Sequence, residues 1–128
     1  MARSIKRSHG LTKVVPATAA AHTVGDLVVE SHFVGMCMST VAVGGTEVLQ
    51  IDGNYRIKVP ASSTDGAILY APGAPVTNGA LLANLTTTNL TLTATGNTPV
   101  ARVAETPVTV NGNLQADCIL IAIGQVAL

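Results

Sequence analysis

Hydrophobic residues along this chain recur in short runs, and several of these runs alternate with polar residues at a period of two. The clearest alternation lies at residues 54–59, where Tyr55, Ile57 and Val59 share one face of an extended segment and polar side chains occupy the other. This pattern is typical of a β-strand that is buried on one side only. Pro60 follows directly, so we expect the strand to end there.

Similar runs predict further strands, with turn residues between them about every 8–12 residues. The segment 33–43 is apolar on both faces and is expected to be covered on both sides. The Ala-rich connector 17–23 is long enough for one helical turn but too short for an independent helix. The remaining strands are expected at 11–16, 27–29, 46–51, 67–70, 85–95, 100–106, 108–110 and 116–123. The pattern predicts an all-β chain, a small single-domain β-barrel or sandwich with short hairpins.

Glycine-containing dipeptides mark the turns between these strands. Residues 44–45 (Gly-Gly) and 52–53 (Asp-Gly) have the residue types of two-residue hairpin turns, which need a positive φ. Residues 111–113 (Asn-Gly-Asn) are expected to form the last turn. Residues 72–79 are rich in proline and glycine and show no period, so we expect a loop there.

Charge is sparse and unevenly placed along the chain. Charged residues make up 11% of it, against about 25% in an ordinary soluble domain. Four of the seven basic residues, Arg3, Lys6, Arg7 and Lys13, lie at the N-terminus, whereas all seven acids lie from Asp26 onwards. Without those four bases, the chain is net −4.

This asymmetry divides the chain into a basic N-terminal arm, residues 1–11, and a single acidic β domain, residues 12–128. Such an arm suits an acidic protein surface or nucleic acid, although a solvated and frayed terminus is the alternative. A domain surface with so little charge, made largely of Thr, Ser, Asn, Ala and Gly, suits packing into an assembly.

Residue types that carry catalysis or bind metals are scattered. Cys37 and Cys118 each lie in an apolar run, where a free cysteine behaves as a small core residue. His9, His22 and His32 have no cysteine or aspartate at a ligand spacing, so no metal site is expected. Three of the seven acids, Asp26, Asp52 and Asp65, stand beside glycine in turns, where carboxylates accept backbone hydrogen bonds. With no G-x-S-x-G motif either, we expect a protein that is not an enzyme.

Three further function classes find little support. A phosphate-binding P-loop needs a Gly-Lys pair, and the sequence has none. No apolar run approaches the roughly 18 residues of a membrane-spanning helix, and no signal-peptide core follows the basic N-terminus, so we expect cytoplasmic synthesis without a signal. Tyr55 comes nearest to a base-stacking platform, but Arg56 and Lys58 face the other way along the strand.

Six short turn and strand signatures occur in the order and approximate spacing of a known family. They are Val24-Gly25-Asp26-Leu27-Val28-Val29, Phe33-Val34-Gly35-Met36, Gly44-Gly45 with Glu47-Val48, Gly53…Val59-Pro60, Gly66…Leu69-Tyr70 and Gly96-Asn97-Thr98. In these motifs the chain resembles the tailed-phage capsid cement, or head decoration, proteins. Many members of that family carry a RecA/RadA-like recombinase label, which the missing P-loop does not support here. Two positions depart from the family pattern: Ala61 replaces a frequent Lys, and Asp65-Gly66 replaces a usual Gly-Asp.

The resemblance implies a structural virion protein without cofactor or metal. It implies a homotrimer on the outer surface of the phage head, where it bridges neighbouring major capsid proteins and stabilises the shell. The candidate capsid contacts are then Arg3, Lys6, Arg7 and Lys13. The alternative is a nucleic-acid-binding β module whose basic arm binds phosphates with a steep salt dependence. The net negative body makes that alternative the weaker one.

Overall fold

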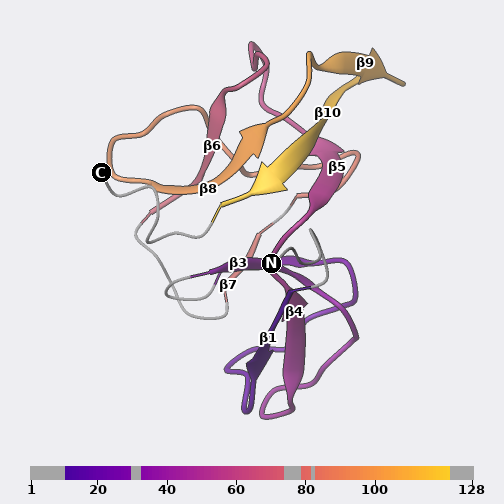
Figure 1. Ribbon diagram of the computed structural model, residues 1–128, viewed down its shortest axis with the longest axis vertical. Coiled ribbons are helices and arrows are strands. Elements are labelled where there is room, and N and C mark those ends of the chain that lie inside the picture. Colours follow the sequence, from indigo (N-terminus) through magenta and orange to yellow (C-terminus); the bar gives the residue numbers. More distant parts are fainter. Residues whose placement is uncertain (1–10, 30–32, 74–78, 82, 122–128) are drawn as a thin grey trace, which may run out of the picture.

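Two antiparallel β-sheets build the computed structural model (Figure 1). The structure describes residues 11–29, 33–73, 79–81 and 83–121, and within these ranges every regular element is a strand. The all-β prediction is confirmed. Both sheets contribute to one apolar core, as in a sandwich.

The first sheet has the strand order β1-β4-β3-β2-β7. Cross-strand partners share a face of a sheet. Cys37 of β3 pairs with Leu49 of β4, whereas Leu27 of β2 pairs with Met36 of β3, so these two pairs lie on opposite faces. The strands of this sheet are β1 (Thr12–Val15), β2 (Leu27–Val29), β3 (Val34–Cys37), β4 (Glu47–Gln50) and β7 (Gly79–Leu81).

The second sheet has the order β5-β10-β8-β6, and β9 also pairs with β10. Gln115 of β10 pairs with Lys58 of β5 and with Val108 of β9, so β5 and β9 lie on opposite edges of β10. The hairpin of β9 and β10 extends away from the rest of the molecule (Figure 1). The strands are β5 (Asn54–Lys58), β6 (Ile68–Ala71), β8 (Thr98–Val103), β9 (Val108–Val110) and β10 (Asn113–Leu120).

The main core lies between the two sheets. Its buried residues come from β2 and β3 of the first sheet, from four strands of the second, and from the segment 83–90. The alternation predicted for residues 54–59 is confirmed, because Ile57 and Val59 are buried in this core and Tyr55 packs against it. Cys118 also lies here, and both cysteines are free and buried, as expected.

The turn predicted at residues 111–113 is formed, and the structure shows that it closes a hairpin. Asn111 has φ +50° and Gly112 has φ +82°, and Val110 pairs with Asn113 across the turn. Positive φ at both central residues is the geometry of a type I′ turn, whose twist matches that of the strands it joins.

The long strand predicted to begin at Phe33 is wrong in length. β3 ends at Cys37, whose carbonyl accepts a hydrogen bond from the N–H of Gly25 (2.8 Å). The Cys37 thiol donates to the carbonyl of Ser39, two residues further on (3.0 Å). These local hydrogen bonds accompany the end of the strand, where the chain leaves the sheet. The part that does form a strand is covered on both faces, as predicted, because three of its four residues are buried.

Two predicted hairpins and the optional helical turn are also not formed. Residues 52–53 connect β4 of the first sheet to β5 of the second. The two strands do not pair with each other, so this turn is not a hairpin. Residues 44–45 belong to a turn closed by a bond from the Gly45 N–H to the Ala42 carbonyl (2.9 Å), within an irregular loop. The connector 17–23 is irregular as well.

No strand forms at 85–95, although leucine and threonine alternate there. The side chain of Asn84 accepts hydrogen bonds from the N–H groups of Thr86 and Thr87, both at 2.8 Å. The Thr88 hydroxyl accepts one from the N–H of Leu90 at 3.0 Å. Local bonds of this kind compete with a sheet ladder, and this segment keeps only isolated bridges.

Gly35 of β3 lies in close contact with β4. A Cβ atom added there would stand 2.7 Å from the Leu49 Cβ and 3.3 Å from the Gln50 carbonyl oxygen. We expect Gly35→Ala to lower the free energy of unfolding by about 1–3 kcal/mol, the usual cost of overpacking, as measured by urea denaturation. A loss below about 0.5 kcal/mol, the range of neutral surface changes, would show that the two strands are not in this contact.

Candidate functional site

The structure places one of the four predicted contact residues. Lys13 lies on β1, with its ammonium 5.5 Å from the centre of the Phe33 ring, within the range of a cation–π interaction. Arg3, Lys6 and Arg7 lie outside the described residues, so the structure does not bring the four together. Just ahead of Lys13, the N–H of Leu11 donates to the Asp52 side chain (3.2 Å), which fixes the start of the domain.

Large apolar side chains are exposed at several places on the surface of the described part of the chain. Val43 in the loop after β3 is 67% exposed and Leu11 before β1 is 62% exposed. Among the described residues, these side chains are Leu11, Val14, Val24, Met38, Val43, Leu85, Leu92, Val108, Val110 and Ile119. Half of them lie on or beside the first sheet, near β1 and the loops around it.

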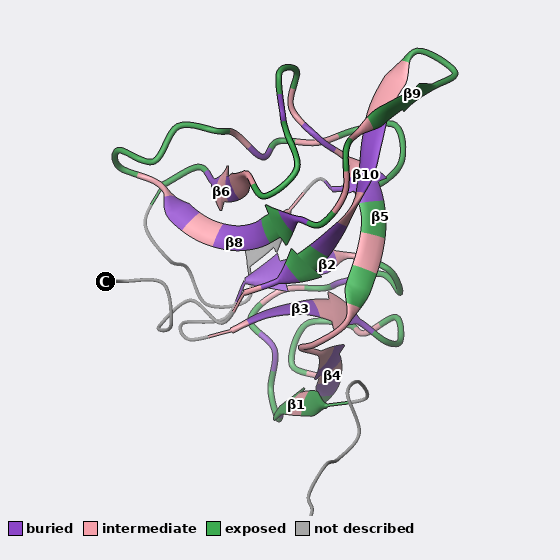
Figure 2. Cartoon of the chain, turned by 45° about the horizontal axis from the view of Figure 1, so that its top comes forward, coloured by how far each residue is buried: buried purple, intermediate pink, exposed green. Residues whose placement is uncertain are grey.

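Strand β9 is the most exposed element of the described part. All three of its residues are exposed, with Val108 at 48% and Val110 at 38%. Among the described strands it pairs with β10 alone. Edge strands are usually protected by charges or by short length; β9 is short and carries no charge, and its hairpin stands out from the molecule (Figure 2).

A second, smaller core lies on the outer face of the first sheet. It consists of Val15, Val28, Cys37 and Leu49, with Ile51 packed against it. These residues are buried although the second sheet lies on the other face. Residues 16–23 and 38–46 cover them, and together we call these two segments the cover. Backbone hydrogen bonds join its two halves.

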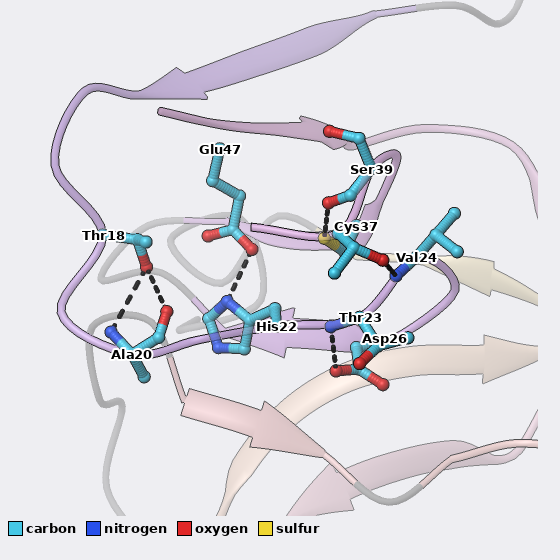
Figure 3. A network of polar contacts seen from close by, with 10 residues as sticks. Thr18, Ala20, His22, Thr23, Val24, Asp26, Cys37, Ser39 and Glu47 are labelled. Atoms are coloured by element: carbon cyan, nitrogen blue, oxygen red, sulfur yellow. Dashed lines mark hydrogen bonds and ion pairs between the residues drawn. The ribbon is translucent and has the colours of Figure 1, made fainter. Parts of the chain in front are cut away.

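A buried acid–imidazole pair joins the cover to the sheet (Figure 3). The Nδ1 atom of His22 lies 2.5 Å from the Oε2 atom of Glu47, and both side chains are fully buried. Glu47 begins β4. Its other oxygen, Oε1, is buried without a hydrogen-bond partner among the described residues. The pair is the most polar feature of the described interior.

Cys37 lies next to this pair, which raises the question of a nucleophilic site. Burial raises the pKa of the Cys37 thiol, and the nearby Glu47 carboxylate raises it further. A reactive cysteine needs the opposite, a lowered pKa and solvent access. Burial likewise raises the pKa of Cys118 to about 12. Burial and a raised pKa therefore both argue against a nucleophilic role for either thiol.

The sequence analysis missed this pair and treated His22 as an isolated residue of a connector. One signal was present. Glu47 and Leu49 are two residues apart on one strand, so they share a face. An acid that shares a face with a buried leucine needs a buried partner.

The basic groups of the second sheet are engaged within the sheet. Arg56 donates to Glu105 (3.0 Å) and Gln115 (3.3 Å), and Lys58 donates to the side chain of Asn113 (3.2 Å). The Tyr55 hydroxyl donates to the carbonyl of Asp52 (2.9 Å) and its ring packs on the core. This arrangement is a core tyrosine with satisfied neighbours, not a stacking platform for bases.

Within the described residues, no cluster of three or more His, Cys, Asp or Glu side chains is arranged to hold a metal ion. The same part of the chain contains no helix that is long and apolar enough to cross a membrane. No family model, curated protein or solved structure matches this chain.

Proposed function

We propose that this chain is a structural virion protein, a capsid cement or decoration protein that binds the assembled head of a tailed phage. It acts as a homotrimer on the outer capsid surface and bridges neighbouring major capsid proteins. The ordered turn and strand motifs of the sequence support this family, and an all-β domain is what the family resemblance implies.

One observation carries the proposal: the domain exposes many large apolar side chains on a surface with few charges. Ten such side chains are exposed among the residues that the structure describes, and charged residues make up 11% of the sequence. The cores of protein–protein interfaces are depleted of charge and enriched in apolar area, and exposed apolar patches commonly mark contact sites. The surface therefore favours a protein that works by contact.

The mechanism we propose is thermodynamic. A subunit that binds the assembled shell, and not the free capsid protein, stabilises the shell by mass action. A trimer multiplies weak contacts through avidity, because the second and third contacts form at high effective concentration. No reacting group is required, and both thiols are buried with a raised pKa.

Sedimentation tests this function against its alternative. The purified protein is mixed with undecorated shells of its phage, with unassembled capsid protein, and with double-stranded DNA, each at low and at physiological salt. We expect co-sedimentation with shells alone. Binding to DNA with a steep loss of affinity as salt rises, and none to shells, would replace the proposal by the nucleic-acid alternative.

The basic arm has its own prediction. Replacing Arg3, Lys6 and Arg7 together by glutamine is expected to weaken shell binding about tenfold, or about 1.4 kcal/mol, because the arm loses its charge for an acidic partner. The free energy of unfolding should change by less than about 0.5 kcal/mol. Arg102→Gln, which removes an exposed charge from β8, is the matched control and should leave binding unchanged. Equal shell occupancy by the triple variant and the control would exclude a role for the arm.

A further inference from the structure

The hairpin of β9 and β10 turns at an asparagine that is followed directly by a glycine, Asn111-Gly112. Both residues are exposed, and both have a positive φ, +50° at Asn111 and +82° at Gly112. The hairpin stands out from the rest of the molecule (Figure 1). Solvent therefore reaches the Asn111 side-chain amide and the backbone nitrogen that follows it.

The backbone nitrogen of Gly112 is unusually accessible. A Cβ atom added at Gly112 would meet nothing within 4 Å, so no neighbouring side chain shields this position. Glycine also has no side chain of its own to restrict the backbone. Among the described residues, no hydrogen bond engages the Gly112 N–H or the Asn111 side chain. The nitrogen and the side-chain amide are thus both free to react with each other.

Asn113, two residues further on, lacks these features. Its Oδ1 atom accepts a hydrogen bond from the Lys58 Nζ atom (3.2 Å), and its Nδ2 atom donates to the Asn111 carbonyl (3.4 Å). Leu114 follows it, and the branched side chain of a leucine crowds its own backbone nitrogen. Asn113 therefore provides an internal comparison of the same chemistry in a held side chain.

The turn must open before the Gly112 nitrogen can approach the Asn111 side chain, because the Asn111 backbone has to rotate out of its turn conformation. Val110 pairs with Asn113 across the turn, and β9 pairs with β10 alone among the described strands. All three residues of β9 are exposed. Chain segments with so little burial open locally at a free-energy cost close to zero. The fold therefore gives Asn111 little protection.

We propose that Asn111 is a self-modification site, at which the chain converts its own side-chain amide into a carboxylate. The Gly112 nitrogen gives its proton to hydroxide and attacks the Asn111 Cγ atom. The new N–Cγ bond closes a five-membered succinimide ring, the Cγ–Nδ2 bond breaks, and the amide nitrogen leaves as ammonia. Asparagine is among the thermolabile residues of proteins, and the reaction needs only the chain and water.

Water then opens the ring at one of its two carbonyl groups. Opening at Cγ gives an aspartate at position 111. Opening at the main-chain carbonyl gives an isoaspartate, in which the backbone runs through the former side chain. The net change is the hydrolysis of one amide, with one water consumed and one ammonia released, and neither route involves an oxidant or a reductant.

The products change the end of the hairpin. Isoaspartate adds a carbon to the main chain of a two-residue turn whose geometry matches the twist of its strands, so the pairing of Val110 with Asn113 is lost. Both products place a negative charge beside Val110, whose side chain is 38% exposed. The modification therefore limits the lifetime of β9 as an ordered apolar surface. It is a property of the chain itself and does not depend on capsid binding.

Peptide mapping tests the site in the full-length protein. The wild-type protein is kept for days in mildly alkaline buffer, and a parallel sample is kept in the same buffer with urea. Trypsin cleaves after Arg102, so the peptide 103–128 contains Asn111 and Asn113 and excludes the other Asn-Gly pair, at residues 78–79. Mass spectrometry with fragmentation distinguishes asparagine, aspartate and isoaspartate at each position.

We expect Asn111 of the native protein to convert at least about tenfold faster than Asn113, to a mixture of aspartate and isoaspartate. Its rate should lie within about tenfold of the rate in urea, because opening the turn costs little. Equal rates at Asn111 and Asn113 would overturn the proposal. So would a native sample that stays unconverted while the urea sample reacts, since the turn would then protect the site.

Hydrogen exchange tests the structural consequence. We expect converted wild-type protein to lose protection in β9, while β8 in the core between the sheets keeps it. The matched control is Asn111→Gly, because glycine accepts the positive φ of the turn and has no amide to convert. This variant, aged in the same way, should keep its exchange pattern. Unchanged exchange of β9 in converted wild-type protein, or an equal loss in Asn111→Gly, would overturn the link between modification and the hairpin.

Discussion

Replacing Glu47 by alanine is expected to lower the free energy of unfolding by about 3–5 kcal/mol. The substitution removes the carboxylate that lies 2.5 Å from the buried His22 Nδ1 atom. It leaves a polar ring fully enclosed and opens a cavity beside Val15, the cross-strand neighbour of Glu47. Removing one partner of a buried pair costs more than the pair contributes, because the remaining group keeps its desolvation cost. Urea denaturation of the wild-type and variant proteins measures the loss.

Two controls make this result specific. Glu105→Ala breaks an ion pair with Arg56 in which both side chains are more than a third exposed, and it also removes the acceptor of the Asp117 N–H (2.9 Å). The two losses together should cost about 1–2 kcal/mol. The double variant His22→Leu with Glu47→Leu removes both polar partners, and it should recover most of the loss, since apolar replacements of buried pairs are often neutral or better. Equal effects of Glu47→Ala and Glu105→Ala would contradict the buried pair.

The second large effect is expected in the core between the sheets. Leu69 of β6 is completely buried there, and Leu69→Ala should lower the free energy of unfolding by about 2–5 kcal/mol through lost burial and a residual cavity. Leu85→Ala is the matched control, because the Leu85 side chain is 47% exposed, and it should change stability by less than about 0.5 kcal/mol. Similar losses in both variants would mean that the two sheets do not pack around Leu69.

The parts of the fold that sequence predicts well are those that short-range chemistry decides. The alternation at Tyr55, Ile57 and Val59 places three side chains against the core because a strand has a period of two. Asn111 and Gly112 form the predicted turn because few other residues accept a positive φ at both positions. In each case the signal and the structure lie within a few residues of each other.

The parts that were predicted wrongly depend on long-range partners. Strand β5 follows β4 after a short turn, yet it pairs with β10, whose residues lie far along the chain, as in the pair of Tyr55 with Cys118. No local feature could therefore separate this turn from a hairpin. Apolar residues after Cys37 looked like a continuing strand, but they belong to the cover. The segment after Asn84 alternates like a strand, and its own side chains satisfy the backbone instead.

The residues of the candidate site were also missed where they depend on partners far along the chain. His22 and Glu47 are 25 residues apart and meet only because the cover folds back across β4. The spacing of His22 and Glu47 along the chain does not predict that they pair. Glu47 itself gives a sign of a buried partner, because it shares a buried face of β4 with Leu49. The exposed valines of β9 could not be identified from sequence either, because a short apolar strand looks the same whether it is covered or open.

These features combine into one physical account of the molecule. A sandwich with a well-filled core provides rigidity, a low-charge surface with exposed apolar side chains provides contact area, and the basic residues at the N-terminus provide attraction to an acidic partner. Nothing in the account requires catalysis.

Thermal rupture of phage heads tests the capsid cement proposal most directly. Undecorated shells are heated with increasing concentrations of the purified protein, and release of the packaged DNA is followed by dye fluorescence. The proposal predicts that the rupture temperature rises with protein concentration until the binding sites are full, because binding to the intact shell stabilises it by mass action. A rupture temperature that does not change at any protein concentration would contradict the proposal.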